Sequence, residues 1–314
     1  MKLILVGPGA FGAKHLEALS NIDGAEIVSI VGPDPARSRA LADRFGIRDT
    51  DVELAAALRR DGVAAAILTS PTALHSMQAL ECLDAGKHVA VEIPAGDNWP
   101  DVERLAAKQS QTGLVCMIGH TRRYNPSHQW IHQQVRSGAF SIQHMDVQTF
   151  FFRRTNTNAL GEHRDWTDHL LWHHAAHSVD LFQYQTGETI EKASVMQGPK
   201  HPELGIAMDM SIQLQTVSGK LLTLALSFNN DGPLGTFFRY IGDTGTYIAR
   251  YDELITGNDD PIDVSSVDVS TNGIEIQDRD FLNCIRSGEE PRASIANVLP
   301  CYRTLKTLED QLNS

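Results

Sequence analysis

The chain has 314 residues, of which 42% are hydrophobic and 21% charged, and this length predicts two domains of ordinary globular composition. The formal net charge is −12, which excludes the broad basic surfaces that bind nucleic acid or anionic membranes. The first apolar run, residues 3–6, is too short for a signal peptide or a membrane span. We therefore expect a cytoplasmic protein that keeps its scattered cysteines reduced and buried: Cys82, Cys116, Cys284 and Cys301.

The first 120 residues alternate short apolar runs with helical patterns. Continuously apolar runs predict strands that are covered on both faces, and their alternation with helices predicts a doubly wound parallel sheet. The predicted strands are 3–6, 27–31, 64–68, 88–91 and 115–118, and the predicted helices are 11–20, 35–45, 52–60, 74–85 and 98–111.

The pattern changes after residue 126. Sequential strand-like runs with few intervening helices predict a large, mostly antiparallel open sheet, and hence a second α/β domain. Its predicted strands are 143–152, 191–196, 208–215, 220–228, 237–242 and 246–250, and its helices run to about 137 and over about 166–185, 277–287 and 294–312. We expect a dinucleotide-binding domain over 1–122 and a domain for substrate binding and oligomerisation over 123–314. The C-terminal helices of the second domain could pack back on the first.

A glycine-rich turn directly follows the first strand and opens a helix. Its sequence is Gly7-Pro8-Gly9-Ala10-Phe11-Gly12. In a G-x-G-x-x-G turn, the first glycine permits the tight bend, the second admits a pyrophosphate and the third lets helix and strand pack closely. In this strand–turn–helix context the motif predicts a dinucleotide site that includes Gly7, Gly9, Ala10, Phe11 and Gly12.

The second strand lacks the acid that usually binds the ribose 2′-hydroxyl of NAD. Gly32 stands at that position, and Asp34 lies in a Gly-Pro-Asp-Pro turn, where a turn-forming role is equally reasonable. Arg37 and Arg39 follow. A missing carboxylate with nearby guanidinium groups predicts NADP, bound through Arg37, while NAD and merely solvated arginines remain alternatives.

Polar residues also follow the fourth and fifth strands, at the edge where open α/β sheets bind ligands. Ser70, Thr72 and His75 follow the fourth strand and Glu92 ends the fifth. We predict that all four lie at the cofactor, although Thr72 could instead cap its helix.

Four segments together resemble the Gfo/Idh/MocA oxidoreductase family: residues 69–75, 85–94, 119–126 and 177–180. The resemblance covers essentially the whole chain. It implies a Rossmann domain followed by an α/β domain whose open sheet often serves oligomerisation, so we expect a homo-oligomer, with a dimer favoured. It also implies a catalytic role for His177.

Two positions depart from the family pattern. The family has Glu-Lys-Pro where this chain has Glu92-Ile93-Pro94, and it has an aspartate where this chain has His173. The lysine usually contacts substrate and assists proton transfer, so both departures argue against a polyol substrate. A sugar or inositol dehydrogenase remains an alternative, as does a dinucleotide-binding regulator without activity.

A narrower resemblance involves residues 119–126, 150–154, 166–177 and 227–239. It is to members of the family that act in protocatechuate breakdown by 4,5-cleavage. It implies NADP-dependent oxidation of a cyclic hemiacetal dicarboxylate to a pyrone dicarboxylate. A hemiacetal hydroxyl is more acidic than a sugar alcohol, so a histidine can serve as its base without the lysine.

Histidines 169, 173 and 177 recur every four residues and would lie on one face of a helix, with His174 beside them. We predict His177 and His173 as catalytic and His174 as a substrate contact, and leave open which histidine holds the proton. Interior structural histidines are an alternative. A metal site is disfavoured, because successive turns of one straight helix rarely converge on one ion.

A dicarboxylate substrate requires local positive charge on this acidic protein. Arginine binds carboxylates through two parallel hydrogen bonds. The candidates are Arg122, Arg123, Arg153 and Arg164. Which of them face the substrate stays open, because adjacent residues on a strand point to opposite faces.

Overall fold

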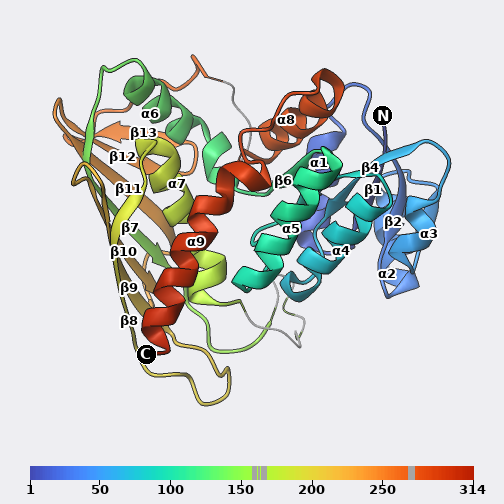
Figure 1. Cartoon of the computed structure of the whole chain (residues 1–314), viewed down its shortest axis with the longest axis horizontal. Coiled ribbons are helices and arrows are strands. Elements are labelled where there is room, and N and C mark those ends of the chain that lie inside the picture. Colours follow the sequence, from blue (N-terminus) through green and yellow to red (C-terminus); the bar gives the residue numbers. More distant parts are fainter. Residues whose placement is uncertain (158–160, 162, 164–167, 268–272) are drawn as a thin grey trace. The chain divides into compact units, whose positions relative to one another are not determined.

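The computed structural model (Figure 1) describes residues 1–157, 161, 163, 168–267 and 273–314. The chain divides into two compact units. Unit 1 comprises residues 1–120 and 274–299, and unit 2 comprises residues 121–273 and 300–314. The predicted substrate contact Arg164 lies outside the described residues.

Unit 1 is built on a parallel sheet of six strands in the order β3-β2-β1-β4-β5-β6. The order reverses between β1 and β4, which is the switch point where doubly wound sheets bind ligands. Only β3 escapes the sequence patterns, because its three residues are polar. The strands are β1 (Lys2–Val6), β2 (Glu26–Val31), β3 (Asp49–Asp51), β4 (Val63–Leu68), β5 (His88–Val91) and β6 (Cys116–Ile118).

Two helices of unit 1, α2 and α5, begin after residues whose side chains cap them. The Asp34 carboxylate accepts hydrogen bonds from the backbone N–H groups of Ala36 and Arg37, and the Asn98 side chain accepts one from Asp101. Helices α1 and α8 pack together, as do α4 and α5. The helices are α1 (Ala10–Leu19), α2 (Pro35–Arg44), α3 (Leu54–Leu58), α4 (Thr72–Asp84), α5 (Trp99–Thr112) and α8 (Ile274–Ser287).

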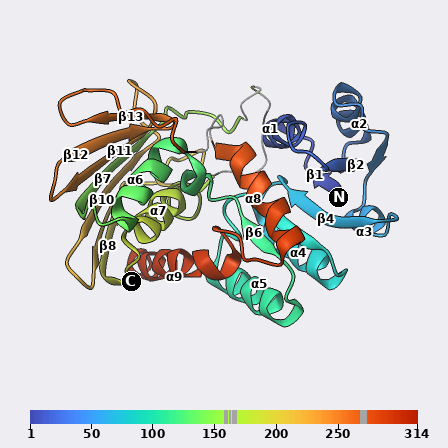
Figure 2. The same cartoon turned by 90° about the horizontal axis from the view of Figure 1, so that it is seen from above.

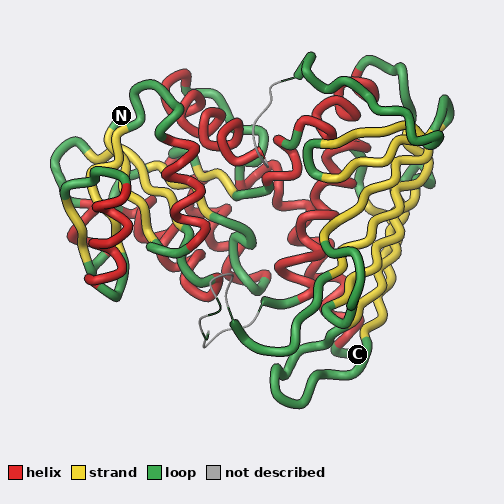
Figure 3. The backbone as a smooth tube through the Cα atoms, turned by 180° about the vertical axis from the view of Figure 1, so that it is seen from behind, coloured by secondary structure: helices red, strands yellow, loops and turns green. Residues whose placement is uncertain are grey.

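Unit 2 is built on a large sheet, whose strands are yellow beside the C-terminus in Figure 3. Its seven strands have the order β13-β12-β11-β7-β10-β9-β8. Strands β7 and β10 pair in parallel near its centre, and every other pair is antiparallel. The predicted fold class, a Rossmann domain with a mostly antiparallel α/β domain, is confirmed. The strands are β7 (Ile142–Phe150), β8 (Ile190–Gln197), β9 (Asp209–Thr216), β10 (Leu221–Ser227), β11 (Gly235–Gly242), β12 (Thr246–Arg250) and β13 (Glu253–Thr256).

Helices α6, α7 and the end of α9 lie on one face of this sheet (Figures 1 and 2). Met210, Ile212 and Leu214 of β9 are buried and alternate with exposed polar residues, as expected of a sheet covered on one face. The helical segments are η1 (Thr121–Tyr124), α6 (Pro126–Arg136), η2 (Leu170–Ala175), α7 (Ala176–Thr186) and α9 (Ile295–Leu312). Among the described residues, no helix has the length and apolar character that crossing a membrane requires.

Candidate active site

The glycine-rich turn brings α1 close to the sheet. A Cβ on Gly7 would lie 2.6 Å from the carbonyl carbon of Thr69, and one on Gly12 would lie 2.3 Å from the Gly7 oxygen. Packing within the protein therefore requires both glycines. A Cβ on Gly9 would meet none of the described residues within 4 Å, and the φ of Gly9, −94°, is open to any residue. Packing against the described residues therefore does not require Gly9, whereas a ligand that approaches the backbone would.

The start of α1 suits that ligand, because the first N–H groups of a helix have no acceptor within the helix. Gly9 precedes the helix without a side-chain cap, and neither Ala10 nor Phe11 brings an acidic group to its first turn. The helix dipole and these donors favour a phosphate. Phe11 is 50% exposed, and the Lys14 ammonium lies 4.7 Å from its ring centre. These residues fit the pyrophosphate of a dinucleotide.

The absence of the ribose-binding acid has a steric reason. A Cβ on Gly32 would lie 2.6 Å from the ring of Pro8, so no side chain fits at the position where the acid usually stands. Asp34 does not replace it, because its carboxylate caps α2. Arg39 is engaged by the backbone oxygens of Ile47 and Arg48. Arg37 lies half-buried in the first turn of α2, and its contact with a 2′-phosphate stays a prediction.

His75 joins the loops after β4 and β5. Its Nδ1 lies 2.8 Å from the Pro94 oxygen and its Nε2 lies 2.8 Å from the Ser70 oxygen. Burial lowers the pKa of His75, so the neutral ring donates one of these bonds. Ser70 donates in turn to Gln78. Thr72 is the first residue of α4 and does not cap it, since Pro71 holds the capping position.

Glu92 directly follows β5 and is hydrogen-bonded to His15 of helix α1. Its Oε1 accepts a hydrogen bond of 3.0 Å from Nε2 of His15. Burial alone would raise the pKa of Glu92, but the hydrogen bond and the charge of His15 lower it. Glu92 is therefore anionic at neutral pH. Ile93, which replaces the lysine of the family pattern, is 4% exposed and packs as a core residue.

In unit 2, the histidine-rich helix differs from its prediction. It begins at Leu170, and its first turn is a π-helix in which the His174 N–H reaches back five residues to the His169 oxygen. His169 precedes the helix and accepts a hydrogen bond from the Leu171 N–H. The predicted stripe of three histidines on one helix face is thus wrong for His169.

The structure brings His173, His174 and His177 together on this helix. The ring centres of His173 and His177 lie 6.5 Å apart, and those of His173 and His174 lie 5.1 Å apart. Phe151 and Phe228 pack against His174, at 5.5 and 5.0 Å between ring centres. The three histidines are half-buried, as expected of groups that meet both a core and a ligand.

Arg153 reaches the same cluster. Its guanidinium lies 4.8 Å from the Phe228 ring centre, and its Nη2 donates a 2.5 Å hydrogen bond to Asp168. The other terminal nitrogen, Nη1, is buried and has no hydrogen-bond partner among the described residues. A buried guanidinium donor without a partner is costly, and a substrate carboxylate would satisfy it. Neither Asp168 nor Phe228 was predicted from the sequence.

The adjacent residues Arg122 and Arg123 have different surroundings. Arg123 is 4% exposed and binds Asp180 through two hydrogen bonds of 2.8 and 2.6 Å. The prediction that Arg123 binds substrate is therefore revised to a structural role. Arg122 lies 4.8 Å from the Tyr251 ring centre, and its buried Nε has no partner in the part of the chain that the structure describes. Burial lowers the pKa of Arg122.

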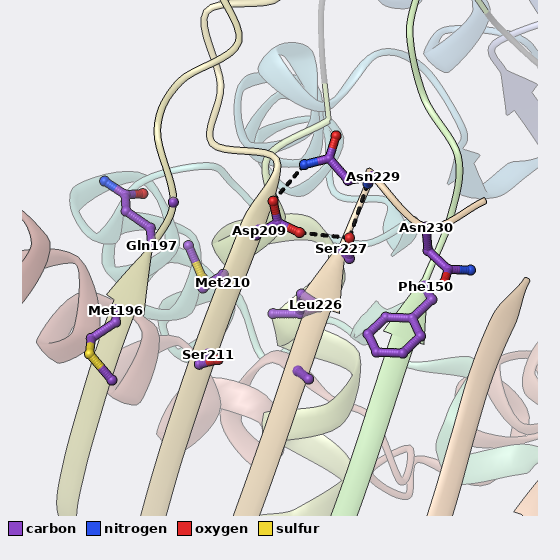
Figure 4. Close-up of a pocket in the computed structure, with 12 residues that line it drawn as sticks. Phe150, Met196, Gln197, Asp209, Met210, Ser211, Leu226, Ser227, Asn229 and Asn230 are labelled. Atoms are coloured by element: carbon purple, nitrogen blue, oxygen red, sulfur yellow. Dashed lines mark hydrogen bonds between the residues drawn. The ribbon is translucent and has the colours of Figure 1, made fainter. Parts of the chain in front are cut away.

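A separate hollow lies on the opposite face of the sheet of unit 2 (Figure 4). Its lining includes Phe150, Met196 and Asp209, and Asp209 accepts hydrogen bonds from Ser227 and Asn229. It contains none of the predicted site residues. Within the described ranges, no group of three or more histidine, cysteine or acidic residues is placed to hold a metal ion, and all four cysteines are free and buried.

Comparisons with known proteins agree with this architecture. Residues 1–120 match the model described as "Oxidoreductase family, NAD-binding Rossmann fold", and residues 126–268 match "Bacterial oxidoreductases, C-terminal". A solved oxidoreductase from Agrobacterium radiobacter, in complex with NAD+, L-tartaric acid and magnesium, superposes with a TM-score of 0.85 at 15% identity. The alignment covers 100% of this chain and 96% of that one. The chain belongs to the Gfo/Idh/MocA family and is an oxidoreductase.

One curated relative is similar over its full length. It is the 4-carboxy-2-hydroxymuconate-6-semialdehyde dehydrogenase of Sphingobium sp. (strain SYK-6), 60% identical over 312 residues that make up 99% of each chain. The inositol 2-dehydrogenase of Rubrobacter xylanophilus is 27% identical over 77% of this chain and 69% of its own length. The predicted family and the narrower resemblance are both confirmed.

The pair of Arg123 and Asp180 generates a stability prediction. Asp180→Asn removes one partner of a buried ion pair and leaves an uncompensated guanidinium, which typically costs about 3–5 kcal/mol. We expect urea unfolding to show a loss of that size. Arg279→Gln is the control, because its partner Glu275 lies one turn away on the surface and such pairs contribute only about 0.5 kcal/mol. A loss under about 1 kcal/mol for Asp180→Asn would contradict the structural role.

Proposed function

We propose that this chain is an NADP-dependent dehydrogenase that oxidises the cyclic hemiacetal of 4-carboxy-2-hydroxymuconate-6-semialdehyde to 2-pyrone-4,6-dicarboxylate. The observation that carries the proposal is the 60% identity over 99% of both chains to the enzyme named for this substrate. Unit 2 also contains histidines that could accept the proton and arginines that could bind the substrate carboxylates. We also retain a cytoplasmic location and a homodimer as predictions.

The reaction balances with groups that the chain provides. The enol oxygen of the semialdehyde adds to its aldehyde carbon and gives a six-membered hemiacetal. Oxidation removes a hydride from that carbon and a proton from its hydroxyl, which leaves the lactone carbonyl of the pyrone. A bound nicotinamide supplies the hydride acceptor. No lysine is required at Ile93, because the hemiacetal hydroxyl gives up its proton more readily than an alcohol does.

We assign the proton to His177, with His173 as its neighbour. The two rings stand perpendicular at 6.5 Å, so His173 can orient the substrate hydroxyl or take the proton on. His174 packs between Phe151 and Phe228. These aromatic rings provide an apolar wall that suits a planar substrate ring.

Arg153 and Arg122 are the proposed carboxylate contacts. Each has a buried guanidinium nitrogen that lacks a partner among the described residues, and arginine suits planar carboxylates. Asp168 fixes the orientation of Arg153 from the other side. In unit 1, Gly9 and the start of α1 would hold the pyrophosphate, and Arg37 would bind a 2′-phosphate.

A spectrophotometric assay tests the proposed function. We expect NADPH formation with the semialdehyde and none with myo-inositol or glucose, because the lysine and aspartate of polyol oxidation are replaced. NADP should be preferred over NAD, since Gly32 leaves no carboxylate beside the 2′ position. Turnover of inositol but not of the semialdehyde would make the chain an inositol dehydrogenase. Dinucleotide binding without turnover of any of the three would support a regulator instead.

The proton acceptor is tested by His177→Asn. We expect kcat to fall at least about 10²-fold, since general base catalysis contributes about 10²–10⁴-fold. Dinucleotide affinity should not change. His144→Asn serves as the control, because His144 lies on β7 and hydrogen-bonds Thr223 of β10. Near-normal turnover of His177→Asn would end its assignment as the base.

The carboxylate contact is tested by a matched pair of neighbours. Arg153→Gln should raise KM for the dicarboxylate about tenfold or more, as expected from losing a charge-assisted hydrogen bond. Arg154→Gln should leave KM within about twofold, because Arg154 is exposed and bonds to Asn229 and backbone oxygens. Equal effects of the two substitutions would remove Arg153 from the proposed site.

A further inference from the structure

His15 lies in a buried charged triad within unit 1. Its Nε2 donates to Glu92 at 3.0 Å, and its Nδ1 lies 3.0 and 2.9 Å from the two carboxylate oxygens of Asp278. The side chains of His15 and Asp278 are 1% and 0% exposed. The three residues come from α1, the end of β5 and α8, so the triad joins segments that are far apart in the sequence.

The triad holds a positively charged imidazole ring. Both ring nitrogens face carboxylates, and only the protonated ring can donate to both. Burial alone would lower the pKa of His15, but the charges and hydrogen bonds of Asp278 and Glu92 raise it to about 10. One imidazolium thus faces two acidic side chains. Burial raises the pKa of Asp278, whereas the hydrogen bond and the charge of His15 lower the pKa of Glu92, so the Glu92 carboxylate stays ionised although it is nearly buried.

Glu92 is fixed from a second side as well. A Cβ on Gly119 would lie 2.7 Å from its Oε1, so the backbone of the segment after β6 packs directly on the carboxylate. The side chain therefore has one orientation, set by His15 and by Gly119.

A purely structural purpose would not need these charges. Replacing a buried ionic group by apolar residues of similar size is often neutral or stabilising. Both helices already have buried apolar side chains that can pack without charged groups. These are Leu16 and Leu19 of α1 and Phe281 and Leu282 of α8. The charged triad is better explained by a requirement of the dinucleotide site.

We propose that His15, held in place by Asp278, is a positioning residue that fixes the Glu92 carboxylate for the nicotinamide half of the dinucleotide, so that α8 contributes to cofactor affinity. The inference rests on the proposed contact between Glu92 and the cofactor. It requires neither the semialdehyde nor turnover, so its test is independent of the proposed substrate.

The test compares a whole dinucleotide with its adenosine half on the full chain. Asp278→Asn keeps the size of the side chain and removes the charge that favours the imidazolium. We expect it to weaken NADPH binding about tenfold, as losing a charged hydrogen bond would. Binding of 2′,5′-ADP, which has no nicotinamide, should stay within about twofold. His15→Gln and Glu92→Gln should reproduce the pattern.

Two controls separate positioning from general destabilisation. Val102→Ala removes buried methyl groups from α5, whose Val102 is 0% exposed, and should lower Tm while leaving both dissociation constants unchanged. If Asp278→Asn does not fold, His15→Gln supports the same comparison. Equal weakening of NADPH and 2′,5′-ADP, or no weakening of either, would overturn the proposal.

The pH dependence of NADPH binding gives a second readout. Among the described residues, His75 faces Glu92, Gln277 hydrogen-bonds Asp278, and Asp97 faces His75. Burial lowers the pKa of His75, so its ring is neutral above pH 6.5. In the unsubstituted chain, a pKa of about 10 keeps His15 protonated, and affinity should be constant from about pH 6.5 to 9. Asp278→Asn should lose affinity across that range as His15 gives up its proton, and a flat profile would contradict the proposal.

Discussion

The close approach of α1 to the sheet is the constraint on which unit 1 depends. Gly7 and Gly12 allow it, because any side chain at either position would overlap the backbone of Thr69 or of Gly7 itself. The approach points the start of α1 toward the proposed phosphate position. It also brings His15, which lies three residues after Gly12 on the buried face of the helix, within 3.0 Å of Glu92. The glycine turn therefore serves both the phosphate and the nicotinamide half of the proposed site.

In unit 2, adjacent arginines have different surroundings, both in the pair Arg122 and Arg123 and in the pair Arg153 and Arg154. Arg123 is bound to Asp180, and Arg154 is bound to Asn229 and backbone oxygens on the surface. Arg122 and Arg153 each retain a buried nitrogen without a partner in the described residues. Contacts within the fold therefore distinguish the two arginines that are proposed to bind carboxylates from Arg123 and Arg154.

Much of the fold was predictable from the sequence because it follows local patterns. Continuous apolar runs predicted the five buried strands of the first sheet, and sequential strand-like runs predicted most of the second. The strand β3 has no apolar run and was missed. The π-turn at Leu170 was also missed, because helical periodicity does not reveal a single turn with altered hydrogen bonds. It displaced His169 from the predicted histidine stripe.

A motif or a family position names Gly9, Glu92 and His177 as site residues in the sequence, and these assignments stay predictions. The residues that hydrogen-bond or pack against them could not be predicted from the sequence. His15 and Asp278 lie 263 residues apart, and the only signal was a charged residue within the apolar face of each helix. The sequence contains no signal for Asp168 or Phe228, since their contact with Arg153 arises from the tertiary structure alone.

A crystal structure with NADP and 2-pyrone-4,6-dicarboxylate would test the central claim most directly. We expect the product carboxylates to bind Arg122 and Arg153. The lactone carbonyl oxygen, which derives from the hemiacetal hydroxyl, should lie within about 3.2 Å of a ring nitrogen of His177. The lactone carbon should lie about 3–3.5 Å from the nicotinamide carbon that accepts the hydride. A product bound with its carboxylates away from both arginines, or with its lactone turned from the histidines, would contradict the proposed function.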